Sequence, residues 1–187
     1  MKHFKSWRSL LLGLAGFGLA GCSVDGATAP KRPDGPSAAL LGNLLTKDAL
    51  TRKTELTSDI TVSAVIGKAG GRLTIPAAGF ELTVPAGAVV SETVFTVTAI
   101  SGTLVAYEFG PHGLKFRVPL RAAQDLSGTT WRQVSLPLTA GYFLDKADLD
   151  ESSKTALVSE VIEGTTSLIS KRFAWQIEHF SGYVVAW

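Results

Sequence analysis

Cysteine is almost absent from this chain, and its scarcity excludes several kinds of stabilisation and chemistry. Cys22 is the only cysteine among 187 residues, so no disulfide can form within the chain. Histidine is nearly as rare, since only His112 and His179 follow His3. A zinc site needs three or four Cys, His or carboxylate ligands, and no two-histidine spacing provides for one. We therefore expect no metal site and no cofactor.

Motifs of catalysis and ligand binding are also missing. No Gly-x-Ser-x-Gly sequence marks a hydrolase nucleophile. The segment 67–71, GKAGG, lacks the residue order of a phosphate-binding loop. The acidic stretch 145–151 lacks the glycine and the closing glutamate of a calcium-binding EF-hand loop. Turnover of an external substrate is therefore the least favoured interpretation.

The first residues form a positively charged start followed by an apolar run. Lys2, Lys5 and Arg8 precede SLLLGLAGFGLAGC, which ends at Cys22. This layout is typical of a secretory signal peptide, and the run is too short to span a membrane as a helix. Removing three positive charges would change the net charge from +2 to 2 − 3 = −1. No basic patch then remains to indicate nucleic-acid binding.

The end of the apolar run, Leu19-Ala20-Gly21-Cys22, resembles the lipobox of bacterial lipoproteins. The resemblance implies that residues 1–21 are a signal peptide and that Cys22 is lipidated after cleavage. Several acyl chains anchor a protein stably, so we expect a lipid-anchored protein of the cell envelope. Ser23 stands where an aspartate usually retains lipoproteins at the inner membrane, which favours the outer membrane. The alternative is an ordinary signal peptide with a leftover cysteine.

Residues 22–59 are expected to link this anchor to a folded domain. The segment 23–36, SVDGATAPKRPDGP, is rich in proline, glycine and small polar residues, and cannot bury enough apolar surface to fold. Residues 37–50 place four leucines at helical spacing after Ser37, which suits a helix N-cap. This pattern predicts a short amphipathic helix that lies on lipid, packs on the domain or frays in solution.

From Ile60 to Trp187 the pattern predicts β-strands. Apolar and polar residues alternate in 60–66, 80–84, 114–120 and 173–177, and Tyr183, Val185 and Trp187 close the chain with the same period. Glycine and proline separate these runs, and short strands with such turn signals are typical of an antiparallel β-sandwich. We therefore expect an all-β domain over residues 60–187. Only residues 147–163 are ambiguous, as one helix or as a loop followed by a strand.

Two segments of this region carry several motifs in a fixed order. They are 67–100, with its Gly70-Gly71 pair and its VPAGA turn at 84–88, and 109–120, with its GPHGL sequence at 110–114. Together they resemble the ZU-5 domain of zonula occludens proteins, netrin receptors and ankyrins. The likeness covers 60–187 and is weakest between residues 124 and 170. It implies a ZU-5-like β-sandwich that acts as a non-catalytic interaction or structural module. The sequence does not identify its protein or glycan partner.

The segment 178–187, EHFSGYVVAW, leaves a second function open. A death-domain adaptor with ZU-5 domains, and an unrelated nucleoporin, cut themselves between Phe and Ser of a His-Phe-Ser sequence. By position, the resemblance implies that Ser181 attacks the carbonyl of Phe180 and that His179 is the base. The alternative is a final strand, in which Gly182 relaxes the backbone. We favour the strand, because glycine here replaces the aromatic residues that follow the serine in the adaptor.

Overall fold

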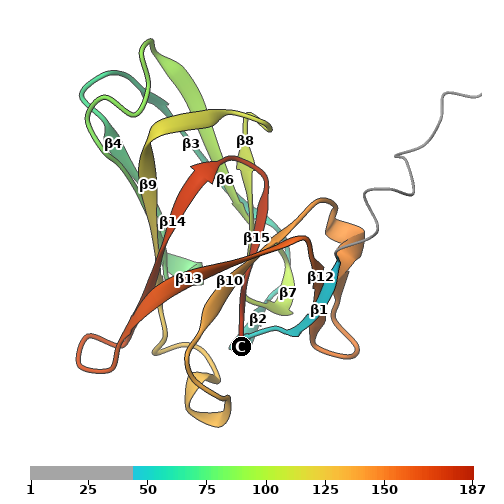
Figure 1. Ribbon diagram of the computed structural model, residues 1–187. Coiled ribbons are helices and arrows are strands. Elements are labelled where there is room, and N and C mark those ends of the chain that lie inside the picture. The colour runs from blue at the N-terminus through green and yellow to red at the C-terminus, as the bar shows by residue number, and fades with distance from the viewer. Residues whose placement is uncertain (1–43) are drawn as a thin grey trace, which may run out of the picture. The chain divides into compact units, whose positions relative to one another are not determined.

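The computed structural model describes residues 44–187, and these residues form an all-β fold, as predicted (Figure 1). Cys22 and the rest of residues 1–43 lie outside the described residues. The strands are β1 Leu45–Asp48, β2 Thr51–Leu56, β3 Ile60–Ile66, β4 Gly71–Ile75, β5 Phe80–Val84, β6 Thr93–Ala99, β7 Gly102–Leu104, β8 Ala106–Gly110, β9 Lys115–Asp125, β10 Thr139–Phe143, β11 Leu149–Asp150, β12 Thr155–Val158, β13 Glu160–Ser167, β14 Arg172–His179 and β15 Gly182–Ala186. Three short 3-10 turns accompany them: η2 Pro76–Ala78, η3 Trp131–Gln133 and η4 Lys146–Asp148.

The main sheet is antiparallel and has the strand order β3-β6-β8-β15-β10-β13-β14-β9-β5-β4. It folds into two layers because β13 serves both of them: residues 160–163 pair with β10, and residues 164–167 pair with β14. A strand that bends from one layer into the other is a usual corner of a sandwich. On the other side, the tight turn between Gly67 and Gly70 joins the edge strands β3 and β4. The sheet is therefore nearly closed around one core.

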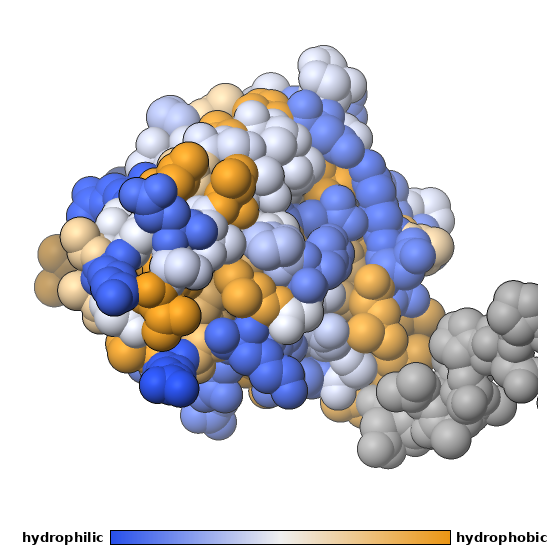
Figure 2. Space-filling view, turned by 90° about the horizontal axis from the view of Figure 1, so that it is seen from above, coloured by the Kyte–Doolittle hydropathy of each residue, from blue (hydrophilic) through white to orange (hydrophobic). Residues whose placement is uncertain are grey.

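Exposed apolar side chains are scattered over the surface of the domain. Seen from above, they are interspersed with hydrophilic residues (Figure 2). Within the described part of the chain, no helix has the length and apolarity that crossing a membrane requires.

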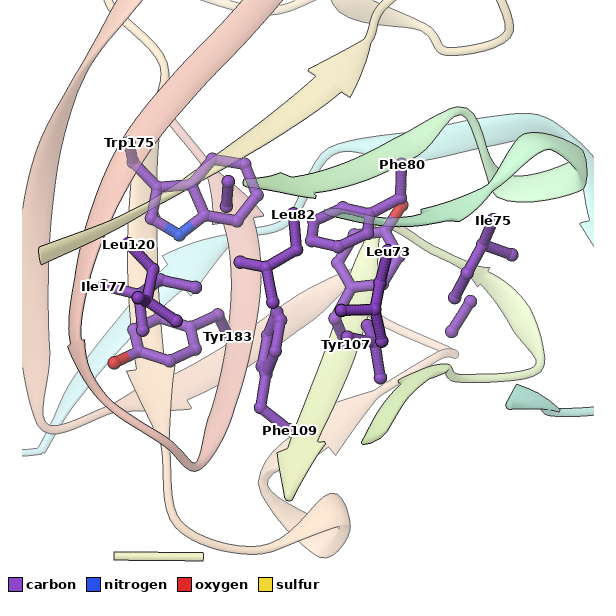
Figure 3. Close-up of a cluster of buried hydrophobic side chains, with 14 of the residues drawn as sticks. Leu73, Ile75, Phe80, Leu82, Tyr107, Phe109, Leu120, Trp175, Ile177 and Tyr183 are labelled. Carbon is purple, nitrogen blue, oxygen red and sulfur yellow. The ribbon is translucent and has the colours of Figure 1, made fainter. Parts of the chain in front are cut away.

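The interior between the layers is filled by aromatic and branched side chains from both of them (Figure 3). The ring of Phe80 lies 4.1 Å from that of Tyr107 and 6.1 Å from that of Trp175, centroid to centroid. The Tyr107 hydroxyl donates hydrogen bonds to the side chain of Gln124 and, at 3.2 Å, to the carbonyl of Ala78. Burial raises the pKa of Tyr107 to about 12, so its hydroxyl stays a neutral donor. The side chains that point inward from alternate positions of the strands thus form the core.

A second, smaller core covers the outer face of one layer. Side chains from β8, β10 and β15 pack there against β12; its buried members are Ala49, Ile100, Leu104, Ala106, Phe143, Ala156, Val158 and Val184. β12 itself lies between β1 and β11 in a three-stranded sheet. Consequently β15 is buried on both faces, and every one of its residues is buried.

The structure differs from the expectation for residues 37–50. Residues 37–43 lie outside the described residues, but Leu45–Asp48 is strand β1 and pairs with β12, so the expected helix is wrong for that part. Strand pairing and the burial of Ala49 and Leu50 outweigh the helical spacing of the leucines. Among the described residues, the β structure therefore begins at Leu45, ahead of the expected domain boundary at Ile60. The ambiguous residues 147–163 form loops and strands rather than one helix.

Candidate functional site

The His-Phe-Ser sequence lies where the chain passes from one layer of the sandwich to the other. His179 is the last residue of β14, and Gly182 is the first of β15. These two strands are not neighbours, because β10 and β13 lie between them in the sheet. Phe180 and Ser181 therefore form a crossover between layers rather than the middle of a strand.

Phe180 is buried at the centre of an aromatic cluster. Its ring lies 4.9 Å from Phe95, 5.4 Å from Phe109 and 4.8 Å from Phe116, centroid to centroid. Both polar groups of its backbone bond to the turn between β8 and β9. Its N–H donates to the carbonyl of Leu114 at 2.9 Å, and its carbonyl accepts from the N–H of Gly113 at 3.0 Å. The residue on the carbonyl side of the candidate scissile bond is thus fixed by packing and by hydrogen bonds.

Ser181 is buried, and its hydroxyl group makes a hydrogen bond. The Oγ atom donates to the carbonyl of Phe143 at 3.4 Å, near the upper limit for a hydrogen bond. The carbonyl of Ser181 accepts from the N–H of Phe109 at 2.9 Å. The candidate nucleophile is therefore directed at β10.

The imidazole of His179 is directed elsewhere. Its Nε2 atom lies 3.6 Å from a carboxylate oxygen of Glu160, and its ring packs edge-on against Tyr142 at 4.9 Å. Among the described residues, no hydrogen bond joins the side chains of His179 and Ser181. The structure thus brings the three predicted residues into one crossover without connecting the candidate base to the candidate nucleophile.

Two further residues complete the crossover: Tyr183, to which the sequence assigned no role at this site, and Gly182. The hydroxyl of Tyr183 donates to the carbonyl of His179 at 2.7 Å, the arrangement called a tyrosine corner in β-sandwiches. Burial, and next the negative charge of Glu160, raise the pKa of Tyr183 well above its usual value, so this donor stays protonated. In the sequence, the only sign of this bond was that Tyr183 follows His179 by four residues.

Gly182 is the other residue, and the expectation that it only relaxes the backbone is wrong. A Cβ atom at this position would overlap the Cε2 atom of the Phe143 ring. Because Phe143 is itself buried, the ring has little room to move. Glycine is needed here because the Phe143 ring occupies the space that a side chain would fill.

An open hollow of about 480 Å³ lies beside the crossover. Its walls include His112, Lys115 and Tyr142 as well as His179 and Ser181. His112 is in the turn between β8 and β9 and is exposed. The two histidines, far apart in the sequence, therefore line one solvent-accessible surface, which their spacing along the chain did not indicate.

Across residues 44–187, no group of three or more His, Cys, Asp or Glu side chains is arranged to hold a metal ion. The lipidation candidate Cys22 lies outside the described residues.

The chain matches no model of a known protein family, and comparison with curated proteins gives no match either. The ZU-5 interpretation therefore remains a prediction.

Proposed function

We propose that the protein is a lipid-anchored component of the cell envelope, and that its ZU-5-like β-sandwich is a non-catalytic interaction or structural module. The observation that carries this proposal is the structural use of the whole segment 179–183. His179 supplies the carbonyl of the tyrosine corner, Phe180 fills the aromatic cluster, and Gly182 admits the ring of Phe143. These roles account for HFSGY without any chemistry.

The positions of the candidate catalytic groups support the same proposal. Base catalysis needs the base within hydrogen-bond reach of the proton that it removes. Here the imidazole of His179 lies 3.6 Å from Glu160, while the hydroxyl of Ser181 bonds to the carbonyl of Phe143. An unstrained amide resists attack, and a twist of ~12° in ω stores only about 1 kcal/mol. The hydrogen bonds on both sides of the Phe180–Ser181 bond hold the crossover in its folded conformation.

Self-cleavage between Phe180 and Ser181 is the second candidate, and one contact favours it. The N–H of Gly113 donates to the carbonyl oxygen of Phe180, where negative charge would develop if Ser181 Oγ attacked the carbonyl carbon. The C–N bond would break as the C–O bond forms, giving an ester and a free amine on Ser181. Water would then hydrolyse the ester, leaving one chain that ends at Phe180 and a second that begins at Ser181.

Denaturing mass spectrometry of the purified full chain separates the two candidates. We expect no species that ends at Phe180, and no change in the set of products when Ser181→Ala is compared with Ser170→Ala, a serine on the exposed β13–β14 loop. A fragment ending at Phe180 that disappears only in Ser181→Ala would replace the non-catalytic proposal with self-cleavage.

The anchor is tested separately. Radiolabelled palmitate should enter the wild-type protein but not Cys22→Ala, and the variant should leave the membrane fraction. Fractionation of the envelope should find the wild-type protein at the outer membrane. Label in Cys22→Ala, or wild-type protein without label, would contradict lipidation at Cys22. The proposed partner is a protein or a glycan of the envelope.

A further inference from the structure

The hairpin between β13 and β14 ends in two apolar side chains that face solvent. Leu168 is 57% exposed and Ile169 is 98% exposed. The hairpin projects from the lower end of the domain in Figure 1. Single exposed apolar residues are common, but an adjacent pair at a projecting tip offers surface that a partner can bury.

A basic hollow lies beside this hairpin loop. Its volume is about 290 Å³, and its walls include Lys53, Arg132, Lys171 and Trp131 but no acidic residue. Lys171 belongs to the hairpin loop, and its carbonyl accepts a hydrogen bond from the N–H of Leu126 at 2.8 Å. The loop that carries the exposed apolar pair therefore also contributes a wall residue to the hollow.

The cations of the hollow are positioned but not neutralised. The Nζ atom of Lys53 donates to the carbonyl of Ser127 at 2.9 Å. The guanidinium carbon of Arg132 lies 5.3 Å from the centroid of the Trp131 ring, within the range of a cation–π interaction. Within residues 44–187, none of Lys53, Arg132 and Lys171 forms a salt bridge. Their charge is available to an anion from outside the chain.

We propose that this surface, the membrane tip, docks the domain on a bilayer that contains anionic lipids. It is made of Leu168, Ile169, Trp131 and the three cations. The apolar pair enters the acyl region, the cations meet headgroup phosphates, and the indole occupies the interface between them. Charge complementarity, and the exposure of the apolar pair on a projecting loop, fit a lipid surface. Docking does not depend on Cys22, but it would hold an anchored domain against its own membrane.

A fluorescent label reports immersion of the tip directly. The full chain carrying Cys22→Ala receives one cysteine, either by Ser170→Cys in the hairpin loop or by Ser63→Cys on the exposed face of β3. Each is labelled with an environment-sensitive dye and mixed with phosphatidylglycerol or phosphatidylcholine vesicles. On phosphatidylglycerol we expect the Ser170→Cys label to move into an apolar environment and the Ser63→Cys label to stay in water. Attachment through the leader is common to both labels, so it does not affect their contrast.

Matched double variants test the two parts of the tip. Leu168→Thr/Ile169→Thr should reduce the ratio of immersed to free tip about tenfold or more on both kinds of vesicle. Lys53→Ala/Arg132→Ala should reduce it about tenfold on phosphatidylglycerol and leave it unchanged on phosphatidylcholine. The controls Val65→Thr/Val94→Thr and Lys115→Ala/Arg117→Ala remove exposed apolar or charged side chains of β3, β6 and β9, outside the membrane tip, and should change nothing.

Three results would overturn the proposal. The first is a Ser170→Cys label that stays in water on phosphatidylglycerol. The second is a control pair that acts as strongly as the tip pair, because immersion would then not depend on this surface. The third is an equal effect of Lys53→Ala/Arg132→Ala on both vesicles, because the hollow would then not meet anionic headgroups. Since every arm uses Cys22→Ala protein, failure of lipidation at Cys22 leaves this test unaffected.

Discussion

The hydroxyl of Tyr183 donates a 2.7 Å hydrogen bond to the carbonyl of His179, and this bond closes the crossover between the two layers. Between the two residues lie Phe180 in the main core and Gly182 against Phe143 of the second core. The bond therefore fixes the stretch of chain that passes between the two cores. The residues of the His-Phe-Ser sequence thus have packing and hydrogen-bonding roles in this crossover.

Removing this bond should destabilise the domain. Tyr183→Phe keeps the ring but leaves the carbonyl of His179 without its donor, which should cost about 1–3 kcal/mol in the free energy of unfolding. Tyr142→Phe is the control, since its ring packs 5.7 Å from that of Tyr183 and, among the described residues, its hydroxyl makes no hydrogen bond. Urea denaturation followed by tryptophan fluorescence measures both. Equal losses in the two variants would contradict a structural role for the corner.

Gly182→Ala should be more damaging than its small size suggests. The added methyl group would overlap the buried ring of Phe143, and overpacking of this kind costs about 1–3 kcal/mol. Gly128→Ala is the matched control, because a Cβ atom there meets nothing within 4 Å, and it should stay within about 0.5 kcal/mol of wild type. Thermal unfolding monitored by circular dichroism compares the two. If Gly182→Ala and Gly128→Ala unfold at the same temperature, glycine is not required at the crossover.

The sequence predicted the strands well because their cause is local. Alternation in 60–66 and 80–84 matches β3 and β5 residue for residue, since each strand buries one face. The bend of β13 between layers and the pairing of β1 with β12 depend on residues far away in the chain. Alternation carries no information about such partners, and it left the leucines near Leu45 to be interpreted as a helix.

The candidate site was predictable only in part for the same reason. The His-Phe-Ser sequence identified the crossover, but the contacts that define it come from β8, β9, β10 and β13. The apolar half of the proposed membrane tip had a local signal, since Leu168 and Ile169 are adjacent apolar residues shortly before the strand run 173–177. The basic half did not, because Lys53, Arg132 and Lys171 come from three separate segments.

A buried arginine provides a third prediction. The Arg52 side chain donates to the carbonyls of Leu104, Ile100 at 3.3 Å and Ala106 at 3.5 Å, and lies 5.6 Å from the centroid of Tyr107. Arg52→Ala removes the charged donor from the buried carbonyls of Leu104 and Ile100, whereas the carbonyl of Ala106 still accepts from the N–H of Ile100. The loss should cost about 3 kcal/mol.

Arg117→Ala is the control for this prediction, since Arg117 is exposed on β9. It should change the free energy of unfolding by less than about 0.5 kcal/mol. Guanidinium denaturation gives the difference between the two variants. A small effect of Arg52→Ala would mean that water replaces the guanidinium, and that the strand β2 is not fixed through this side chain.

The last prediction concerns acid stability at the turn before β3. The carboxylate of Asp59 accepts from the N–H of Ser101 at 2.7 Å and pairs with Lys146 at 3.0 Å. The hydrogen bond from Ser101, and next the pairing with Lys146, lower the pKa of Asp59 from 3.8 to about 2. Because the folded-state pKa is the lower one, this carboxylate stabilises the fold above the unfolded pKa, and the stabilisation is lost as pH falls from about 4 to about 2.

Asp59→Asn removes this titration, and comparison with wild type isolates it. The side chain is largely exposed, so solvent screening limits the contribution to about 1 kcal/mol or less. Other acidic groups, including Asp150 with its lowered pKa, act equally in both proteins and cancel. Urea midpoints of the two proteins should converge as pH falls through the acid range, because the protonated carboxyl of Asp59 is then as uncharged as the amide that replaces it. A difference in urea midpoint between Asp59→Asn and wild type that stays constant with pH would show that the negative charge of Asp59 does not stabilise the fold. Only a charge effect can disappear on protonation.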